Sequence, residues 1–205
     1  MSPMSHAVKL LRNLYRVVLL RAREHEARLA NPLAARCFAP LEGLEPRLML
    51  SSATLGNDGR LSVLGDELDN TVTIQQTAHT GDGADVSLTL DGQTQEFTGV
   101  KSILVQTGDG SDRIRLFSAL TVQTQIEGED GSDWLTGPDE VCDWTLDGAA
   151  SGTAAGATFS GIENLVGGSE ADVFTMTGAF GGTIDGGGGL DGLDYSSHTD
   201  SVSVD

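Results

Sequence analysis

A short motif rich in glycine and aspartate recurs through this chain of 205 residues. From the last residue of one copy to the last of the next, the steps are 42, 21, 39 and 19 residues, close to multiples of 20. A fixed period in which an apolar strand follows a turn-forming corner is typical of a solenoid. The five clearest copies span residues 65–70, 107–112, 128–133, 167–172 and 186–191, and a weaker sixth copy spans residues 80–85.

Each copy combines two residue types with different physical roles. Glycine adopts positive φ without steric cost, so it permits a sharp corner. The aspartate carboxylates and nearby backbone carbonyls are hard oxygen ligands, which suit Ca²⁺ because this ion takes six to eight oxygens at about 2.3–2.6 Å. One corner supplies too few ligands for such a shell, whereas two corners stacked one coil apart can share it.

The segment Gly186–Asp194 has the form Gly-Gly-x-Gly-x-Asp-x-apolar-x at every fixed position. This pattern resembles the calcium-binding nonapeptide of hemolysin-type, or repeats-in-toxin (RTX), proteins, in which calcium lies between the corners of neighbouring coils. The other copies depart from the pattern. Thr107 replaces the first glycine, Glu129 the second and Glu170 the one at the fourth position, and Asn70 replaces the final aspartate.

The resemblance implies two calcium sites, one between corners 107–112 and 128–133 and one between corners 167–172 and 186–191. In the alternative interpretation, the same copies are glycine-rich β-turns with solvated aspartates. The metal ligands that the resemblance implies are Gly108, Asp109, Gly110, Asp112, Gly128, Asp130, Gly131, Asp133, Gly167, Gly168, Asp172, Gly186, Gly187, Gly189 and Asp191.

Charge divides the chain near residue 50. Residues 1–50 hold eight basic and four acidic residues, a net charge of +4, whereas residues 51–205 hold four basic and 26 acidic residues, a net charge of −22. Such a charge resists compaction unless cations bind or screen it. It also argues against a nucleic acid as a partner of the acidic part.

Residues 1–31 are predicted to form a basic amphipathic helix, because apolar residues recur at helical spacing between Ala7 and Ala30. Attachment to a membrane surface and docking on a partner or on the stack both remain open roles. The longest unbroken apolar run, Val17–Leu20, is too short for a transmembrane span or an ordinary secretory signal.

Residues 32–52 are predicted to be a linker, since Pro32 and Pro40 end the helix. Within it, Leu44-Glu45-Pro46-Arg47 with Leu50-Ser51 is similar to the LEPR-XLL-type tract found near the start of large repetitive bacterial surface and exported proteins. The resemblance implies a signal read by an export machinery, and an extracellular or cell-surface location.

Residues 53–205 are predicted to be all-β, a parallel β-helix or β-roll solenoid with coils of about 20 residues, because Thr-, Val- and Ile-rich segments alternate between the corners. Asp91-Gly92 predicts a turn outside the corner series, and Gly148–Gly156 predicts a looser excursion. No capping segment follows Asp194, so we expect a stack truncated at its C-terminus.

No catalytic constellation is present, so we expect a protein that is not an enzyme. The four histidines are widely spread, and Cys37 and Cys142 have no metal-ligand spacing. The prediction is a structural or adhesive protein that binds calcium, with a cell-surface or matrix partner. Two alternatives remain: the non-catalytic start of a larger β-helical enzyme acting on polysaccharide, and an adhesive spacer without metal.

Overall fold

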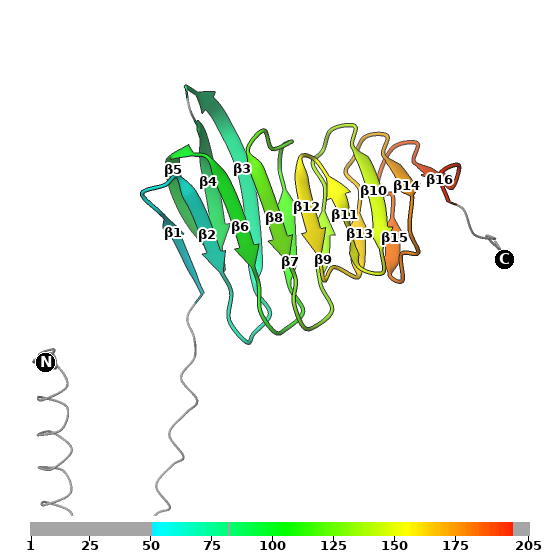
Figure 1. The fold of residues 1–205 in the computed structure, drawn as a ribbon, viewed down its shortest axis with the longest axis horizontal. Coiled ribbons are helices and arrows are strands. Elements are labelled where there is room, and N and C mark those ends of the chain that lie inside the picture. The colour runs from blue at the N-terminus through cyan, green and yellow to red at the C-terminus, as the bar shows by residue number, and fades with distance from the viewer. Residues whose placement is uncertain (1–50, 82, 199–205) are drawn as a thin grey trace, which may run out of the picture. The chain divides into compact units, whose positions relative to one another are not determined.

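The computed structural model describes residues 51–81 and 83–198, and within them the chain is all-β, with sixteen strands and no helix (Figure 1). The strands are β1 Ser52–Leu55, β2 Arg60–Leu64, β3 Thr71–Thr80, β4 Gly83–Leu90, β5 Gln93–Val100, β6 Ser102–Gln106, β7 Arg113–Leu116, β8 Gln123–Glu127, β9 Trp134–Thr136, β10 Asp143–Gly148, β11 Ser151–Ala154, β12 Ala157–Ser160, β13 Asn164–Val166, β14 Val173–Met176, β15 Thr183–Asp185 and β16 Gly192–Asp194.

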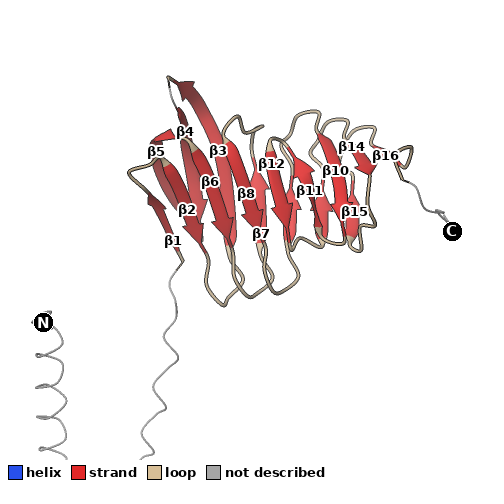
Figure 2. Cartoon of the chain, in the orientation of Figure 1, coloured by secondary structure: helices blue, strands red, loops and turns tan. Residues whose placement is uncertain are grey.

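The strands form two sheets. Sheet A has nine strands in the order β1-β2-β6-β8-β12-β11-β10-β14-β16, and sheet B has seven in the order β15-β13-β9-β7-β3-β4-β5. Figure 2 shows these strands joined by short loops along the length of the described part. Neither sheet closes into a barrel within the described residues.

The chain passes between the two sheets at each of the five clearest motif copies. Strands β2, β6 and β8 pair in parallel in sheet A, while the strands that follow them, β3, β7 and β9, pair in parallel in sheet B. Leu61 therefore pairs with Ile103, and Ile103 with Thr124, so equivalent positions of successive repeats are neighbours. Each repeat of the sequence motif here thus adds one strand to sheet A and one strand to sheet B.

Two antiparallel segments interrupt this pattern. Strands β3, β4 and β5 pair antiparallel in sheet B, and strands β10, β11 and β12 do so in sheet A. Both sheets are therefore mixed. The all-β prediction is confirmed, whereas the parallel sheets that it specified are met only in part, because local hairpins replace whole coils at these places.

The hairpins explain three features of the sequence. The predicted turn at Asp91-Gly92 is confirmed, since both residues have positive φ (48° and 77°) between β4 and β5. The weak sixth copy of the motif does not form a corner between the sheets, because Thr80 and Gly83–Asp85 belong to the antiparallel strands β3 and β4, in which Thr80 pairs with Gly83. The excursion expected at Gly148–Gly156 contains β11, an added strand of sheet A.

Apolar side chains from alternating strand positions fill the space between the sheets, where burial of apolar surface stabilises the fold. Trp144 is fully buried and stacks on Phe174 with ring centroids 5.2 Å apart. Phe159 meets Trp144 edge-on at 6.2 Å. These three rings come from β10, β14 and β12, so they hold together the part of sheet A that contains the antiparallel hairpins.

The predicted N-terminal helix, residues 32–50 of the linker and residues 199–205 lie outside the described residues. Of the Leu44–Ser51 tract, only Ser51 is described. In the part of the chain that the structure describes, no helix is long and apolar enough to cross a membrane.

Candidate metal-binding corners

The motif copies fall on two different edges of the sheets. Corners 65–70, 107–112 and 128–133 lead from sheet A to sheet B, and we call them the first corner edge. Corners 167–172 and 186–191 lead from sheet B back to sheet A, at the opposite ends of the strands (Figure 1). We call these two, with residues 137–142 between β9 and β10, the second corner edge.

On the first corner edge, corners 107–112 and 128–133 are direct neighbours, as the sequence predicted. Gly110 and Gly131 form a parallel bridge, and the Gly110 amide donates to the Asp130 carbonyl at 3.1 Å. A Cβ atom at Gly131 would lie 1.7 Å from the Gly110 carbonyl oxygen, so the stacking requires glycine there. Thr107, which replaces the first glycine, donates its hydroxyl to the Gly128 carbonyl at 3.2 Å.

On the second corner edge, corners 167–172 and 186–191 are also neighbours, as predicted. The Gly167 amide donates to the Asp185 carbonyl at 2.8 Å, and the Gly188 amide donates to the Gly168 carbonyl at 3.0 Å. The last aspartate of this edge, Asp191, is exposed. Both predicted pairs of corners therefore exist, but they lie at opposite ends of the strands.

The final residues of the first-edge corners form a chain of hydrogen bonds, which we call the first carboxylate ladder. The Asn70 amide donates to Asp112 Oδ1 at 2.7 Å, and the Asp112 amide donates to Asp133 Oδ1 at 2.9 Å. The Asp133 amide in turn donates to Glu163 Oε2 at 3.0 Å. Asp112 and Asp133 have no exposed surface. Each carboxylate thus satisfies a backbone amide of the preceding coil, where an unpaired buried amide would be costly.

A second carboxylate ladder runs along the second corner edge. The Cys142 amide donates to Asp172 Oδ1 at 2.9 Å, and the Asp172 amide donates to Asp191 Oδ1 at 3.0 Å. Asp172 also accepts the Gly168 amide of its own corner, at Oδ2 and 2.6 Å. Both oxygens of this buried carboxylate are therefore hydrogen-bonded.

The first ladder differs in its second oxygens. Asp112 Oδ2 and Asp133 Oδ2 are buried and have no hydrogen-bond partner. Burial raises the pKa of Asp112 and the nearby Thr107 hydroxyl opposes this rise, but that hydroxyl donates its hydrogen bond to the Gly128 carbonyl. The second residues of their corners, Gly108 and Glu129, have positive φ (89° and 64°), whereas Gly168 does not. The amide at this position reaches the terminal side chain in corner 167–172, and no such bond forms in corners 107–112 and 128–133. The backbone conformation of the corner thus decides whether the final carboxylate keeps an oxygen without a hydrogen-bond partner, which we call an open oxygen.

Burial raises the pKa of Asp133 to about 6, against the favourable hydrogen bond from the Asp112 amide, and the negative charges of Asp112 and Glu163 act in the same direction as burial. Burial also raises the pKa of Asp112. A carboxylate whose pKa is raised favours a bound proton or another cation. A positive charge bound at the first corner edge would therefore stabilise the ionised forms of Asp112 and Asp133.

The remaining predicted ligands are less enclosed. Asp109 and Asp130 are exposed at the outer side of their corners. No three His, Cys, Asp or Glu side chains converge closely enough to hold a metal ion among the described residues. Any cation at these corners must therefore take most of its ligands from backbone carbonyls and water.

Sequence reasoning missed three members of these edges. Glu163 ends the first ladder from a corner of only three residues between β12 and β13, and nothing in its surroundings follows the motif. Asp91, placed outside the corner series, accepts the Thr71 amide at 2.9 Å and the Asn70 side-chain amide at 3.2 Å. Corner 137–142 begins with glycine and ends in Cys142 where the other copies have Asp or Asn, so the motif could not be recognised there.

Comparison of the chain with family models, with curated proteins and with solved structures finds no match. The fold and the corners define the chain only as a two-sheet, all-β protein whose acidic corners stack in two ladders. Its function must therefore be argued from the geometry of those corners.

Proposed function

We propose that residues 53–205 form a β-solenoid, interrupted by hairpins, that binds calcium at its corners and serves as a structural or adhesive part of an exported or surface-displayed bacterial protein. Three observations support this proposal: the stacked copies of the motif, the net charge of −22 over residues 51–205, and the similarity of Gly186–Asp194 to the RTX nonapeptide. A cation bound between corners would offset the repulsion of so many carboxylates.

The observation that carries the proposal is the pair of buried carboxylate oxygens without partners, Asp112 Oδ2 and Asp133 Oδ2. Buried polar atoms are nearly always hydrogen-bonded, so two such exceptions on neighbouring corners call for an explanation. A bound cation is a simple one, since Ca²⁺ accepts carboxylate, carbonyl and water oxygens in flexible geometry.

The first corner edge is where these residues fit calcium best. Asp112 and Asp133 would supply carboxylate oxygens, and the corner glycines would supply backbone carbonyls. The ligand set proposed there is Gly108, Asp109, Gly110, Asp112, Gly128, Asp130, Gly131 and Asp133. Calcium bound there would join consecutive coils and compensate the charge of the buried carboxylates.

Calcium titration of the full-length chain tests the proposal, with far-ultraviolet circular dichroism and thermal melting as readouts. A ligand that binds only the folded form raises its stability in proportion to the logarithm of ligand concentration. We expect the melting temperature to rise between chelator and millimolar Ca²⁺, and to rise much less with Mg²⁺. Identical melting curves in Ca²⁺ and chelator would reject calcium binding.

A metal-free adhesive spacer is the second candidate, and the amide-to-carboxylate hydrogen bonds favour it. In the second ladder both oxygens of Asp172 are satisfied by backbone amides, so stacking there needs no ion. The two candidates differ in one measurement: the spacer would keep its full stability in chelator, whereas the calcium-binding protein would not.

We also propose that residues 1–50 direct export, on the strength of their charge and the Leu44–Ser51 tract. Deleting residues 1–50 should leave the calcium response intact and abolish delivery to the cell exterior. Expression of both forms in the native host, followed by fractionation, measures this. Normal surface amounts of the shortened form would assign the basic segment another role, such as attachment to a membrane surface.

A further inference from the structure

Asn70 is the one final corner residue, among the five clearest copies of the motif, that is not an aspartate. It ends corner 65–70 on the first corner edge, and only 3% of its surface is exposed. Its backbone amide donates to Asp112 Oδ1, so it belongs to the first carboxylate ladder. Its side chain, however, brings an NH₂ group to the position where the later corners have a carboxylate.

The two ends of the Asn70 carboxamide have different partners. The carbonyl oxygen accepts the Asp66 amide of the same corner at 2.9 Å. The nitrogen donates to Asp66 Oδ1 at 3.3 Å and to Asp91 Oδ2 at 3.2 Å. The Leu68 amide donates to the first of these carboxylates, and the Thr71 amide to the second, both at 2.9 Å. One NH₂ group thus bridges two carboxylates that the backbone holds in place.

The strand order of sheet B explains why a donor is needed at this corner. In the later corners of the first edge, the final side chain accepts the amide of the final residue one coil earlier. Sheet B continues past β3 with β4 and β5, so the β4–β5 turn lies where a preceding coil would be. That turn presents Asp91, which is an acceptor. A carboxylate at residue 70 would face it with no proton or cation between them.

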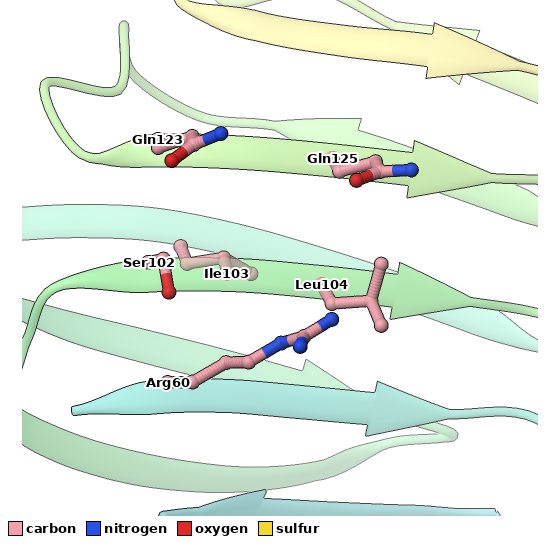
Figure 3. Close-up of a pocket in the computed structure, with 6 residues that line it drawn as sticks. All are labelled: Arg60, Ser102, Ile103, Leu104, Gln123 and Gln125. Atoms are coloured by element: carbon pink, nitrogen blue, oxygen red, sulfur yellow. The ribbon is translucent and has the colours of Figure 1, made fainter. Parts of the chain in front are cut away.

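No basic side chain pairs with these two carboxylates in the ranges that the structure describes. The salt bridge found there joins Arg115 and Asp139. The Arg60 side chain, at the start of β2, extends towards Leu104 in a shallow groove on sheet A (Figure 3). The Asn70 amide is therefore the group that meets both carboxylates, and its two N–H donors allow one hydrogen bond to each.

We propose that the Asn70 carboxamide takes the place of a metal ion at this end of the first carboxylate ladder. Its N–H groups join the two carboxylates that a bound cation would otherwise join, so corner 65–70 stacks without calcium. Calcium dependence then begins at corners 107–112 and 128–133, whose final carboxylates keep open oxygens. The inference rests on the proposed function for the calcium at those later corners, but for corner 65–70 it rests on the hydrogen bonds of Asn70.

Asn70 is on this proposal the residue that determines which corner takes no metal. Among the described residues no three His, Cys, Asp or Glu side chains are close enough to hold a metal ion, and around Asn70 the group stops at Asp66 and Asp91. Asn70→Asp supplies a third carboxylate at the same place and removes the two donors. The variant should therefore need a cation where the natural chain needs none, because three carboxylates suit Ca²⁺ and repel one another without it.

The test compares the full-length natural chain with Asn70→Asp by thermal melting in chelator and in millimolar Ca²⁺, and by equilibrium dialysis, which counts bound calcium. In chelator the variant should melt about 5–10 °C below the natural chain, a shift typical of one uncompensated buried charge in a chain of this size. Calcium should recover roughly half of this difference or more, because it binds only the folded form. The variant should also bind one further calcium ion per chain.

Asn57→Asp is the matched control, since it adds the same charge at an exposed asparagine in the turn before β2. It should change neither the melting temperature nor the number of bound ions. Asn70→Asp combined with Asp91→Asn exchanges donor and acceptor at unchanged net charge. This double variant should recover the stability in chelator and lose the further calcium ion.

An Asn70→Asp chain that calcium stabilises no more than the natural chain overturns the proposal, whether it melts lower in both buffers or stays unfolded in both. A further ion bound by Asn57→Asp, or a double variant as unstable in chelator as Asn70→Asp, would overturn it as well. A calcium response of Asn70→Asp beside an unresponsive natural chain would retain this inference and reject calcium binding at the later corners.

Discussion

Asp133 on the first corner edge and Asp172 on the second are buried aspartates at the same position of the same motif, and each accepts a backbone amide from a neighbouring coil. Asp172 accepts a second amide, from Gly168 of its own corner, whereas Asp133 Oδ2 has no partner. The difference arises one residue into the corner, where Glu129 has positive φ and Gly168 does not.

The comparison separates two roles that one motif can perform. In corner 167–172 the carboxylate is a structural acceptor and its hydrogen bonds are complete. In corners 107–112 and 128–133 the carboxylate still joins the coils but retains an open oxygen and, at Asp133, a pKa of about 6. A motif count therefore overstates the number of corners whose final carboxylate has an oxygen without a hydrogen bond.

The largest effect is expected at the completed carboxylate. Asp172→Ala leaves the amides of buried Cys142 and half-buried Gly168 without acceptors, and each such loss costs about 1–3 kcal/mol. Urea unfolding should show a loss of roughly 3 kcal/mol in Ca²⁺ and in chelator alike. A loss that calcium largely restores would mean that Asp172 is a metal ligand rather than a structural acceptor.

A smaller effect, specific to calcium, is expected at the open carboxylate. Asp133→Asn keeps the Oδ1 acceptor for the Asp112 amide but removes the negative charge. The calcium-induced stabilisation, about 2–3 kcal/mol for the natural sequence at a hundredfold excess over Kd, should largely disappear. Asp172→Asn is the matched variant and should retain it. Loss of the calcium-induced stabilisation in both variants would show that the two corner edges respond to calcium in the same way, and would contradict the difference between Asp133 and Asp172.

Without metal, stability should depend on pH through the first ladder. The folded-state pKa of Asp133 lies above its ordinary value of 3.8, so the folded protein binds more protons than the unfolded chain between about pH 4 and pH 6. In chelator, the free energy of unfolding should therefore rise by about 1–2 kcal/mol when pH falls from 7 to 5. Asp133→Asn should flatten this rise. A stability that falls over this range in chelator would contradict the assignment.

The smallest effect is expected at Asp91, which the sequence placed outside the corners. Its carboxylate accepts bonds from Thr71 and Asn70 beside the start of the first ladder. Asp91→Ala should cost about 1 kcal/mol in chemical unfolding, with no change in the calcium response. Asp58→Ala, in the turn before β2, serves as a comparison outside the first carboxylate ladder. Equal losses of stability in the two variants would show that Asp91 does not contribute to this ladder.

Much of the candidate site could be predicted because its signals are local. Glycine marks the sharp corners, and the aspartate at a fixed offset marks the residue that stacks. The resemblance to the RTX nonapeptide then implied that corners 107–112 and 128–133 are neighbours, which they are. Glu163 and Asp91 could not be found in this way. They reach the first ladder from 30 and 21 residues away along the chain, through hydrogen bonds that no local pattern encodes.

By itself the sequence determined the all-β class, the turn at Asp91-Gly92 and the residues that form the five clearest corners, because these depend on short-range alternation and on backbone freedom at glycine. Only the tertiary structure decided which corners share an edge, where hairpins replace coils, and which buried carboxylates keep an open oxygen. Those outcomes depend on strand pairing across 20–40 residues and on the backbone conformation of single corner residues such as Glu129 and Gly168. Nearly identical motifs can reach either state, because the second residue of the corner itself supplies or withholds the second hydrogen bond.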